Sequence, residues 1–314
     1  MKTILVTGGA GYIGSVAVKQ LLENDFEVVV IDNLSNGNKE LLDQKAKLYE
    51  FDLAKDDFNQ VFEENKIDAV MHFAAYKMVD ESMKHPNKYF DNIKGTVNLL
   101  NSMVKHDVKK IIFSSSAAVY GSSEGVVDED AETNPTSYYG YTKLESEKEL
   151  EWFHKIHGIN YLSLRYFNVA GDGGLNYVAK DAKNVFEIMM EVIIGKRNEF
   201  MVFGEDYDSR DGTCIRDYIH ILDLVSAHIL ALKSDFNGII NLGTSNGVSV
   251  KELINATKEV TGKDFKVVFG KKRSGDIGVS IASNKRAQKA LIWSPIYNVK
   301  DMIKSMYDSY QTKI

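Results

Sequence analysis

A glycine-rich turn near the start of the chain constrains the fold more than any other feature of the sequence. Thr3–Thr7 is a short apolar run that predicts a buried strand, and Tyr12–Asn24 has the apolar spacing of a helix. The turn between them, together with Gly14, satisfies both G-x-G-x-x-G and G-x-x-G-x-x-G. Such a turn lets backbone approach a pyrophosphate closely, at a helix N-terminus where free N–H groups favour anions. We therefore expect a dinucleotide site that includes Gly8, Gly11, Tyr12, Ile13 and Gly14.

A carboxylate after the next predicted strand selects the cofactor. Glu27–Ile31 is strand-like, and Asp32 follows it, 18 residues after Gly14. A carboxylate at this place binds ribose hydroxyls and repels a 2′-phosphate, so we expect NAD rather than NADP. The residues expected to complete the cofactor pocket are Asn33, Ser35, Asn36, Gly37, Asp52, Leu53, Phe73, Ala74 and Ala75. For Asp52, contact with the adenine edge and capping of a helix are equally favoured.

The first half of the chain alternates short β-rich runs with longer helical patterns. The further strands expected are Lys47–Phe51, Ala69–Phe73, Lys110–Ser114 and Tyr161–Arg165, and the long helices are 86–106 and 139–157. Strands separated by helices imply right-handed βαβ units, so we expect an α/β protein with a Rossmann-type doubly wound parallel sheet.

The regular alternation of predicted strands and helices ends after Gly171. The expected strands there are 201–203 and 214–219, and the expected helices are 184–195, 222–233, 250–261, 285–291 and one from about 299. We expect an NAD-binding domain of residues 1–170, rejoined by part of 214–245, and a smaller mixed α/β substrate lobe of residues 171–314.

Composition narrows the class of protein. The 314 residues carry a net charge of −6, which argues against a general nucleic-acid binder. No apolar run reaches the roughly 18 residues that a membrane span needs. A single cysteine, Cys214, cannot form an internal disulfide, so a reducing cytoplasm is the expected compartment. The scattered histidines and acids show no metal-ligand spacing, so no metal is expected.

A serine, a tyrosine and a lysine form a candidate catalytic constellation. Ser114, Ser115 and Ser116 end the fifth predicted strand, at the edge where doubly wound sheets bind ligands. Tyr139 and Lys143 are four residues apart on the next helix and share a face. A tyrosine pKa of about 10 makes a phenolate at pH 7 costly by about 4 kcal/mol. The positive charges of Lys143 and an oxidised nicotinamide could offset most of that cost, which would make Tyr139 a general base for a sugar hydroxyl. An ordinary helix face is the alternative interpretation of this spacing.

Several stretches of the chain resemble the extended short-chain dehydrogenase/reductase family, and within it the UDP-glucose 4-epimerases. They are TGGAGYIGS, IDNLSNG, HFAA, FSSSAAVYG, YGYTK, LRYFNVAG, DGTCIRDYIH and RSGD, in order along nearly the whole chain. The last three are typical of members that act on nucleotide sugars.

The resemblance assigns roles to individual residues. It implies Ser116, Tyr139 and Lys143 as catalytic, with Lys143 also binding the nicotinamide ribose, and it adds Lys77, Asn92, Ser114 and Tyr166 to the cofactor contacts. The implied substrate contacts are Lys77, Ser116, Tyr139, Phe167, Asn168, Asn184, Phe203, Arg216, Tyr218, Arg273, Asp276 and Ser280. Two arginines suit a diphosphate, which agrees with these assignments.

The implied activity is NAD-dependent 4-epimerisation of a UDP-hexose through a 4-keto sugar. Related dehydratases and decarboxylases carry an acidic residue just after the active-site serine or threonine, whereas Ala117 and Ala118 come after Ser116 here. The alternative functions are another nucleotide-sugar epimerase or 4-reductase, and a non-catalytic NAD-sensing protein. The family also implies a homodimer formed through the helices of 86–106 and 139–157.

Two departures from the family pattern concern the sugar side of the site. Ser280 falls where some members carry a bulky tyrosine, so we expect room for an N-acetyl group and acceptance of UDP-GlcNAc and UDP-GalNAc. The segment 175–187 lacks the usual composition, which leaves its conformation and some UDP contacts open.

Overall fold

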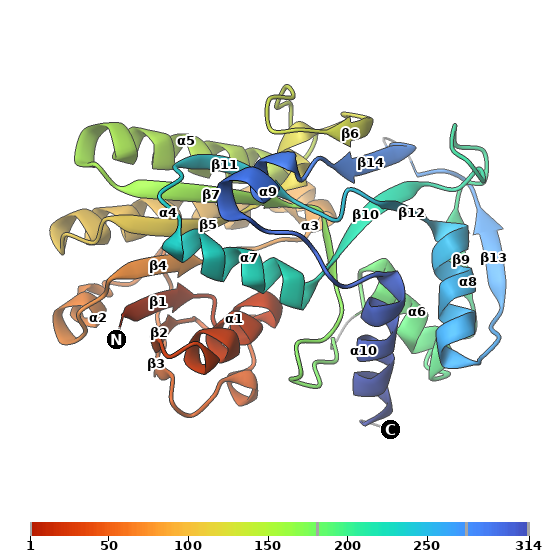
Figure 1. The fold of residues 1–314 in the computed structure, drawn as a ribbon, viewed down its shortest axis with the longest axis horizontal. Coiled ribbons are helices and arrows are strands. Elements are labelled where there is room, and N and C mark those ends of the chain that lie inside the picture. The colour runs from red at the N-terminus through yellow and green to blue at the C-terminus, as the bar shows by residue number, and fades with distance from the viewer. Residues whose placement is uncertain (1, 180–181, 274–275, 313–314) are drawn as a thin grey trace.

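A seven-stranded parallel sheet forms the first part of the molecule. The computed structural model describes residues 2–179, 182–273 and 276–312 (Figure 1). The strand order is β11-β7-β5-β4-β1-β2-β3, and every neighbouring pair is parallel. The bounds are β1 Thr3–Thr7, β2 Glu27–Ile31, β3 Lys47–Tyr49, β4 Ala69–His72, β5 Lys110–Ser116, β7 Asn160–Tyr166 and β11 Gly238–Leu242. The predicted doubly wound parallel sheet is confirmed.

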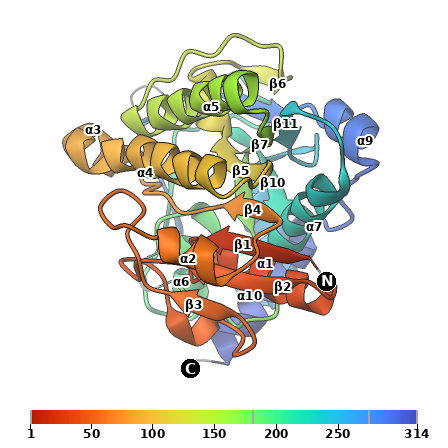
Figure 2. The same cartoon turned by 90° about the vertical axis from the view of Figure 1, so that its left-hand side faces the viewer.

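Both faces of this sheet are buried, which explains its continuous apolar strands. Ile4 and Val6 of β1 face one core and Leu5 faces the other, because side chains alternate along a strand. The first core lies under α1 (Tyr12–Glu23), α7 (Ile221–Lys233) and α9 (Lys285–Leu291). The second lies under α2 (Asn59–Glu64), α4 (Pro86–Lys105) and α5 (Tyr138–His157), and Figure 2 shows α4 side by side with α5.

The second part of the molecule has its own sheets and its own core. A five-stranded sheet has the order β12-β10-β14-β6, with β8 paired to β10, and β13 pairs with β9. The bounds are β6 Gly125–Val127, β8 Asn168–Ala170, β9 Phe200–Phe203, β10 Ile215–His220, β12 Gly247–Ser249, β13 Val267–Gly270 and β14 Val279–Ala282. The helices α6 (Val185–Ile193), α8 (Val250–Thr261) and α10 (Val299–Gln311) cover these strands around a core that includes Phe186, Met189 and Leu253 (Figure 1).

Most predicted elements are present, with small shifts at their ends. The predicted strand 110–114 extends to Ser116, and the predicted strand 69–73 ends at His72. The elements that the sequence did not predict are short: α2, α3 (Val79–Lys84), β6, β8, β11 to β14 and the single turns η1 (Lys39–Leu41) and η2 (Ala117–Tyr120). Segments of three to six residues show too few periods for a pattern to emerge, and long-range pairing forms them. The edge strand β11 is one example, because its partner β7 lies far away in sequence.

Candidate active site

The glycine turn joins β1 to α1 and is shaped to receive a phosphate group. Gly8 has φ +70°, a conformation that favours glycine, and a Cβ there would lie 2.6 Å from the backbone nitrogen of Ala74. A Cβ on Gly14 would lie 2.1 Å from the carbonyl oxygen of Gly8, so this position also requires glycine. The N-cap of α1, Gly11, has no capping side chain, and the first turn has no acidic residue. The helix N-terminus is therefore available to an anion.

Asp32 lies at the end of β2, beside this turn. Its carboxylate accepts hydrogen bonds from the backbone nitrogens of Ala10 (2.9 Å) and Leu34 (2.8 Å), although burial raises its pKa. Gly37 comes close as well, since a Cβ there would lie 2.9 Å from Asp32 Oδ1. The loop after β2 thus folds back onto the glycine turn, as a ribose pocket requires. Ser35 and Asn36 are exposed in this loop, and Asn33 Oδ1 accepts from the Ser35 backbone nitrogen at 3.1 Å.

Asp52 caps a turn rather than an α-helix. Its Oδ1 accepts from the backbone nitrogen of Ala54 at 2.9 Å, and its Oδ2 receives the Asn33 amide at 3.1 Å and the Lys55 ammonium at 2.9 Å. Lys55 and these amides hold the pKa of Asp52 below its usual value against the effect of burial. The bond to Asn33 joins Asp52 to the loop beside Asp32. Leu53 is buried in the core under α4.

The segment after β4 lies close to the glycine turn. The backbone nitrogens of Phe73 and Ala74 donate to the carbonyl oxygen of Thr7 at 3.0 and 3.1 Å, so these residues border the turn, and Ala75 comes directly after them. Asn92 holds the next residue, because its amide bonds the backbone nitrogen (2.8 Å) and carbonyl oxygen (3.0 Å) of Tyr76. Asn92 therefore shapes the segment from buried surroundings.

Two further predicted residues lie around the glycine turn. The Lys77 ammonium lies 5.9 Å from the centroid of the Tyr12 ring, and desolvation lowers its pKa. Tyr12 donates to the carbonyl oxygen of Gly171 and packs against Tyr177, with ring centroids 4.9 Å apart and ring planes tilted by 36°. Part of the segment 171–179 is thus attached to the first helix.

Ser116, Tyr139 and Lys143 meet at the carboxyl end of β5. Tyr139 and Lys143 share a face of α5, and Ser116 is the last residue of β5. The Ser116 hydroxyl lies near the Tyr139 phenol and lowers its pKa. The Lys143 ammonium donates to the carbonyl oxygen of Ser114 at 2.6 Å and lies 6.0 Å from the centroid of the Tyr139 ring. The structure therefore brings the three predicted catalytic side chains together.

The protein's own groups favour the neutral forms of this site. Burial lowers the pKa of Lys143 to about 7, and the Glu147 carboxylate, one helical turn away, acts in the opposite direction. Burial raises the pKa of Tyr139, and the nearby Ser116 hydroxyl offsets part of that rise. An additional positive charge is therefore needed near Tyr139 to produce a phenolate at neutral pH.

A cluster in the second part of the molecule gathers four of the predicted nucleotide contacts, three of them charged. Asp276 accepts hydrogen bonds from Arg216 Nη2 at 2.6 Å and from Arg273 Nη2 at 3.1 Å. The Arg273 guanidinium also lies 5.1 Å from the centroid of the exposed Phe203 ring. Two cations, one carboxylate and one aromatic face suit a diphosphate, ribose hydroxyls and a planar base. Ser274 and Gly275, which complete the RSGD stretch, lie outside the described residues.

Tyr207 belongs to this cluster, although no sequence pattern indicated it. Its hydroxyl donates to Asp276 Oδ2 at 3.2 Å, and burial together with Asp276 raises its pKa to about 12. No motif singles out a tyrosine in the segment between β9 and β10, so the sequence offered no signal for it.

The strand register places Ser280 beside Arg216. Ser280 of β14 pairs with Arg216 of β10 on one side and with Gly125 of β6 on the other. Register partners in neighbouring strands project from the same face, so Ser280 lies on the face that carries Arg216. Since β6 comes after Ser116 and η2 in sequence, this sheet connects the charged cluster to the end of β5.

The remaining predicted contacts have mixed placements. Asn184 is the N-cap of α6 in a capping box with Glu187, so its side chain is already bonded. The Tyr218 ring is buried against Phe186, with centroids 5.1 Å apart. Asn168 donates to the carbonyl oxygen of Asp217 at 3.0 Å from an otherwise exposed position, and Phe167 packs beside the small cluster around Val119, Tyr120 and Val127.

Asp172 organises the start of the atypical segment 175–187. Its carboxylate accepts from the backbone nitrogens of four residues, with the shortest bond, 2.7 Å, from Gly174. These bonds hold the backbone of residues 174–177 around the Asp172 carboxylate. Lys180 and Asp181 lie outside the described residues.

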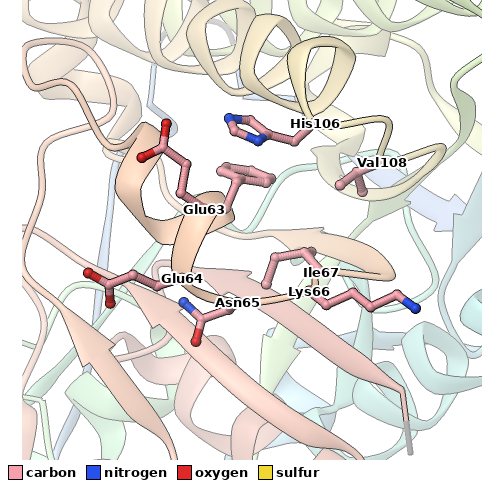
Figure 3. A pocket seen from close by; sticks show the side chains of 8 residues that line it. Glu63, Glu64, Asn65, Lys66, Ile67, His106 and Val108 are labelled. Atoms are coloured by element: carbon pink, nitrogen blue, oxygen red, sulfur yellow. The ribbon is translucent and has the colours of Figure 1, made fainter.

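A pocket elsewhere on the molecule is unrelated to these residues. Figure 3 shows side chains that line this pocket, among them Glu63, Lys66 and His106. The volume of the pocket is about 310 Å³. Ile67 and Val108 on its wall precede β4 and β5, so the pocket lies at the amino-terminal ends of these strands, whereas Ser116 lies at the carboxyl end of β5.

The described residues also show neither a metal-type cluster nor a membrane-length helix. Across 2–179, 182–273 and 276–312, no three His, Cys, Asp or Glu side chains gather in a way that could hold a metal ion. Within the same ranges, no helix is both long and apolar enough to cross a membrane.

Comparison with known proteins identifies the family. Residues 4–243 match the NAD dependent epimerase/dehydratase family. The chain belongs to this family. It is 42% identical over 311 residues to the UDP-glucose 4-epimerase of Lacticaseibacillus casei, covering 96% of this chain and 94% of that protein.

Solved structures of the NAD dependent epimerase/dehydratase type superpose closely. The UDP-glucose-4-epimerase of Stenotrophomonas maltophila, with bound NAD and formylated UDP-arabinopyranose, gives a TM-score of 0.95 at 36% identity over 100% of this chain and 99% of that one. The UDP-Glc/GlcNAc 4-epimerase of Campylobacter jejuni gives 0.88 at 39% identity over 99% of this chain and 100% of that one. The family predicted from the sequence motifs is thus confirmed.

Proposed function

We propose that the protein is an NAD-dependent UDP-hexose 4-epimerase that interconverts UDP-glucose and UDP-galactose. The observation that carries this proposal is the joint placement of Ser116, Tyr139 and Lys143 at the end of β5. A two-arginine cluster with Asp276 lies on the sheet that extends from that point. A family member with bound NAD and a UDP-sugar shares the fold at a TM-score of 0.95.

The residues present fit NAD. The uncapped N-terminus of α1 and the close approach of Gly8, Gly14 and Ala74 leave room for a pyrophosphate but none for side chains. Asp32, beside the same turn, would bind the adenosine ribose. The remaining predicted contacts border this path, although Asp52, Leu53 and Asn92 contribute by shaping it from behind.

The chain's own residues then divide the chemistry. Tyr139 would remove the proton of the sugar 4-hydroxyl, and Ser116 would hold the same oxygen by a hydrogen bond. NAD, when bound, would supply a hydride acceptor at C4 of the sugar, a donor for the return step, and a positive charge that favours the phenolate. Lys143 would hold the nicotinamide ribose and add its own charge when protonated. The 4-keto sugar would present its other face before Tyr139 returns the proton, so the cycle has no net redox change.

The two alanines after Ser116 disfavour elimination. Ala117 and Ala118 begin the turn η2 and bring no proton carrier to the sugar. A dehydratase or decarboxylase would need an acid or base at this place. Reversible oxidation at one carbon is the chemistry that the residues support.

Conversion of UDP-galactose tests the activity. The purified protein is incubated with UDP-galactose without added cofactor, and UDP-glucose is followed by chromatography. We expect conversion, its loss by at least 1000-fold in Tyr139→Phe, and rates within twofold of wild type in the neighbouring control Tyr138→Phe. No conversion even with NAD⁺ supplied would reject the 4-epimerase assignment and favour another nucleotide-sugar reaction.

We further propose that UDP-GlcNAc and UDP-GalNAc are substrates. Ser280 is small and lies on the same sheet face as Arg216, so this side of the sugar site has room for an acetamido group. The similar Campylobacter jejuni protein is named a UDP-Glc/GlcNAc 4-epimerase. Ser280→Tyr should lower the rate on UDP-GalNAc relative to UDP-galactose by tenfold or more. An unchanged ratio of the two rates would contradict the idea.

The two parts of the molecule are suited to bind different ligands. We propose that residues 1–170, rejoined by part of 214–245, bind the cofactor, and that 171–314 bind the UDP group. Within 214–245, α7 packs on α1 and β11 pairs with β7 of the large sheet. The mainly buried Cys214 fits the reducing cytoplasm that we propose as the compartment.

A homodimer is the proposed assembly. Tyr141, Trp152 and Ile156 lie on one stripe of α5 and are 41%, 57% and 66% exposed, and Phe90 is exposed on the adjacent helix α4. Apolar side chains in such a row favour burial against a second copy. Light scattering should give twice the 35.3 kDa of one chain, and the double variant Trp152→Glu/Ile156→Glu should give a monomer. A monomeric wild-type protein would exclude this assembly.

A further inference from the structure

A second tyrosine is held beside the predicted catalytic residues, bonded to a histidine that the proposed reaction does not use. Tyr166 ends β7 and is the register partner of Ser116. Its hydroxyl lies 3.2 Å from Nε2 of His228, which α7 supplies from the next layer. His228 is fully buried, and its ring also packs on Phe73, with centroids 4.9 Å apart.

The hydrogen bonds fix the direction in which each group donates. Nδ1 of His228 lies 2.8 Å from the carbonyl oxygen of Leu224, and a carbonyl can only accept. Nδ1 therefore carries the ring proton, and Nε2 of the neutral imidazole is an acceptor. The Tyr166 hydroxyl must then donate to Nε2. Burial lowers the pKa of His228 to about 4, which keeps the ring neutral at ordinary pH.

The same tyrosine continues the network toward Lys143. The Ser114 side chain lies near the Tyr166 phenol and lowers its pKa against the rise that burial causes. The carbonyl oxygen of Ser114 accepts the Lys143 ammonium at 2.6 Å. One residue, Ser114, thus lies beside Tyr166 and bonds Lys143 by its backbone.

We propose that His228 is a positioning residue that acts through Tyr166: it directs the Tyr166 proton away from the reacting sugar and holds the strand end on which Lys143 and Ser116 depend. The proposal rests on the 4-epimerase function above. Tyr139 lies close enough to Tyr166 for its charge to raise the pKa of Tyr166. Efficient catalysis needs one of the two phenols to exchange protons and the other to stay inert. Without an acceptor at position 228, the Tyr166 hydroxyl is free to donate toward Tyr139. A donor there lowers the pKa of Tyr139 and competes with the sugar 4-hydroxyl for its oxygen.

Kinetics with matched variants test the proposal. His228→Leu should lower kcat for UDP-galactose at least tenfold, leave KM within twofold, and move the acid limb of the kcat–pH profile to lower pH. His228→Gln, whose amide oxygen can accept the Tyr166 proton, should recover most of the lost kcat. Equal losses in the Leu and Gln variants, or a wild-type kcat in His228→Leu, would overturn the role.

A double-mutant cycle separates this role from a general packing defect. Tyr166→Phe removes the group through which His228 is said to act, so His228→Leu should cause no further loss of kcat in the Tyr166→Phe background. Losses that multiply would show that His228 acts independently of Tyr166. If His228→Leu does not fold, His228→Gln takes its place in the same cycle. The proposal would then be overturned by a kcat of His228→Gln above that of the wild type, or by a loss that multiplies with that of Tyr166→Phe.

A spectroscopic measurement tests the hydrogen bond between Tyr166 and His228 independently of enzymatic activity. In the ¹⁵N-labelled protein, the two-bond ¹H–¹⁵N correlations of His228 should show a neutral ring protonated at Nδ1, and Tyr166→Phe should shift its Nε2 resonance. An Nε2–H tautomer would overturn the proposal even in an active enzyme. Conversely, an Nδ1–H ring in a protein that does not epimerise UDP-galactose would leave the hydrogen-bond assignment in place and reject only the proposed function.

Discussion

Lys143 donates a 2.6 Å hydrogen bond to the carbonyl oxygen of Ser114, two residues before Ser116. This bond joins α5, which carries Tyr139, to the end of β5, which carries Ser116. One side chain therefore links the helix of Tyr139 to the strand end of Ser116. Glu147, one turn further along α5, raises the pKa of Lys143 against the lowering effect of burial.

Replacing Lys143 should reduce catalysis far more than substrate binding. Lys143→Met removes both the charge and the bond to Ser114, so we expect kcat to fall roughly 100-fold or more, within the range of lost acid–base assistance. KM for UDP-galactose should change by less than threefold, because this variant leaves Arg216 and Asp276, the proposed contacts of the UDP group, unchanged. Steady-state rates at pH 7 and 8.5 check this, and a variant that keeps a tenth of the wild-type kcat would contradict it.

The buried ion pair behind the site should be essential for stability. Arg165 and Glu147 side chains are each 3% exposed and 2.6 Å apart. Removing one partner leaves an unpaired buried charge, so Glu147→Gln should cost about 3–5 kcal/mol of unfolding free energy. Urea denaturation measures this.

The control for that experiment lies on the same helix. Glu151 pairs with Lys155 at the surface, so Glu151→Gln should cost less than about 1 kcal/mol. The double replacement Glu147→Leu/Arg165→Met should recover part of the stability lost in Glu147→Gln. Equal costs for Glu147→Gln and Glu151→Gln would show that burial of the pair has no consequence.

Acid should destabilise the fold through three buried histidines. Burial lowers the pKa of His72 to about 3 and those of His220 and His228 to about 4. Their unfolded value is about 6.5, so the unfolded chain binds protons that the folded one does not. The stability they provide is complete above pH 6.5 and is lost as pH falls toward 4, by about 1.4 kcal/mol per pH unit for each ring.

Urea titrations between pH 7 and 5 measure this slope. His220→Asn keeps a side-chain cap on α7, where His220 Nδ1 accepts from the Leu222 backbone nitrogen, while removing one titrating ring. The slope should fall by about a third in this variant. A free energy of unfolding that stays constant from pH 7 to 5 would exclude the effect.

Ile292 offers a stabilising substitution. It ends α9 in the left-handed conformation, with φ 52°, and is 92% exposed. This conformation costs a β-branched residue about 1–2 kcal/mol. Glycine adopts it without that strain, although its greater freedom in the unfolded chain offsets part of the gain. We expect Ile292→Gly to raise the free energy of unfolding by about 0.5–1 kcal/mol.

Ile296 is the matched control, because it is 79% exposed and does not have a positive φ. Ile296→Gly should therefore lower the thermal midpoint slightly while Ile292→Gly raises it. Changes of the same sign in both variants would mean that exposure, and not backbone conformation, governs the result.

The large sheet was predictable because its residues repeat a strong local pattern. Strands such as Thr3–Thr7 and Glu27–Ile31 were predicted to the residue, since both faces are buried and the strands are apolar throughout. The short strands β8, β12 and β14 were not, because their pairing partners lie far away in sequence. The register of β14 against β10, which decides where Ser280 lies, is a long-range property of this kind.

The predicted site divides in the same way. Gly8, Asp32, Ser116, Tyr139 and Lys143 could be named from the sequence because their chemistry depends on the ends of consecutive elements and on a four-residue helical spacing. Those local relations fix the type of cofactor and the base. Tyr207 and His228 were set by packing between distant segments, because a side chain's partner, burial and pKa depend on neighbours that local sequence does not specify.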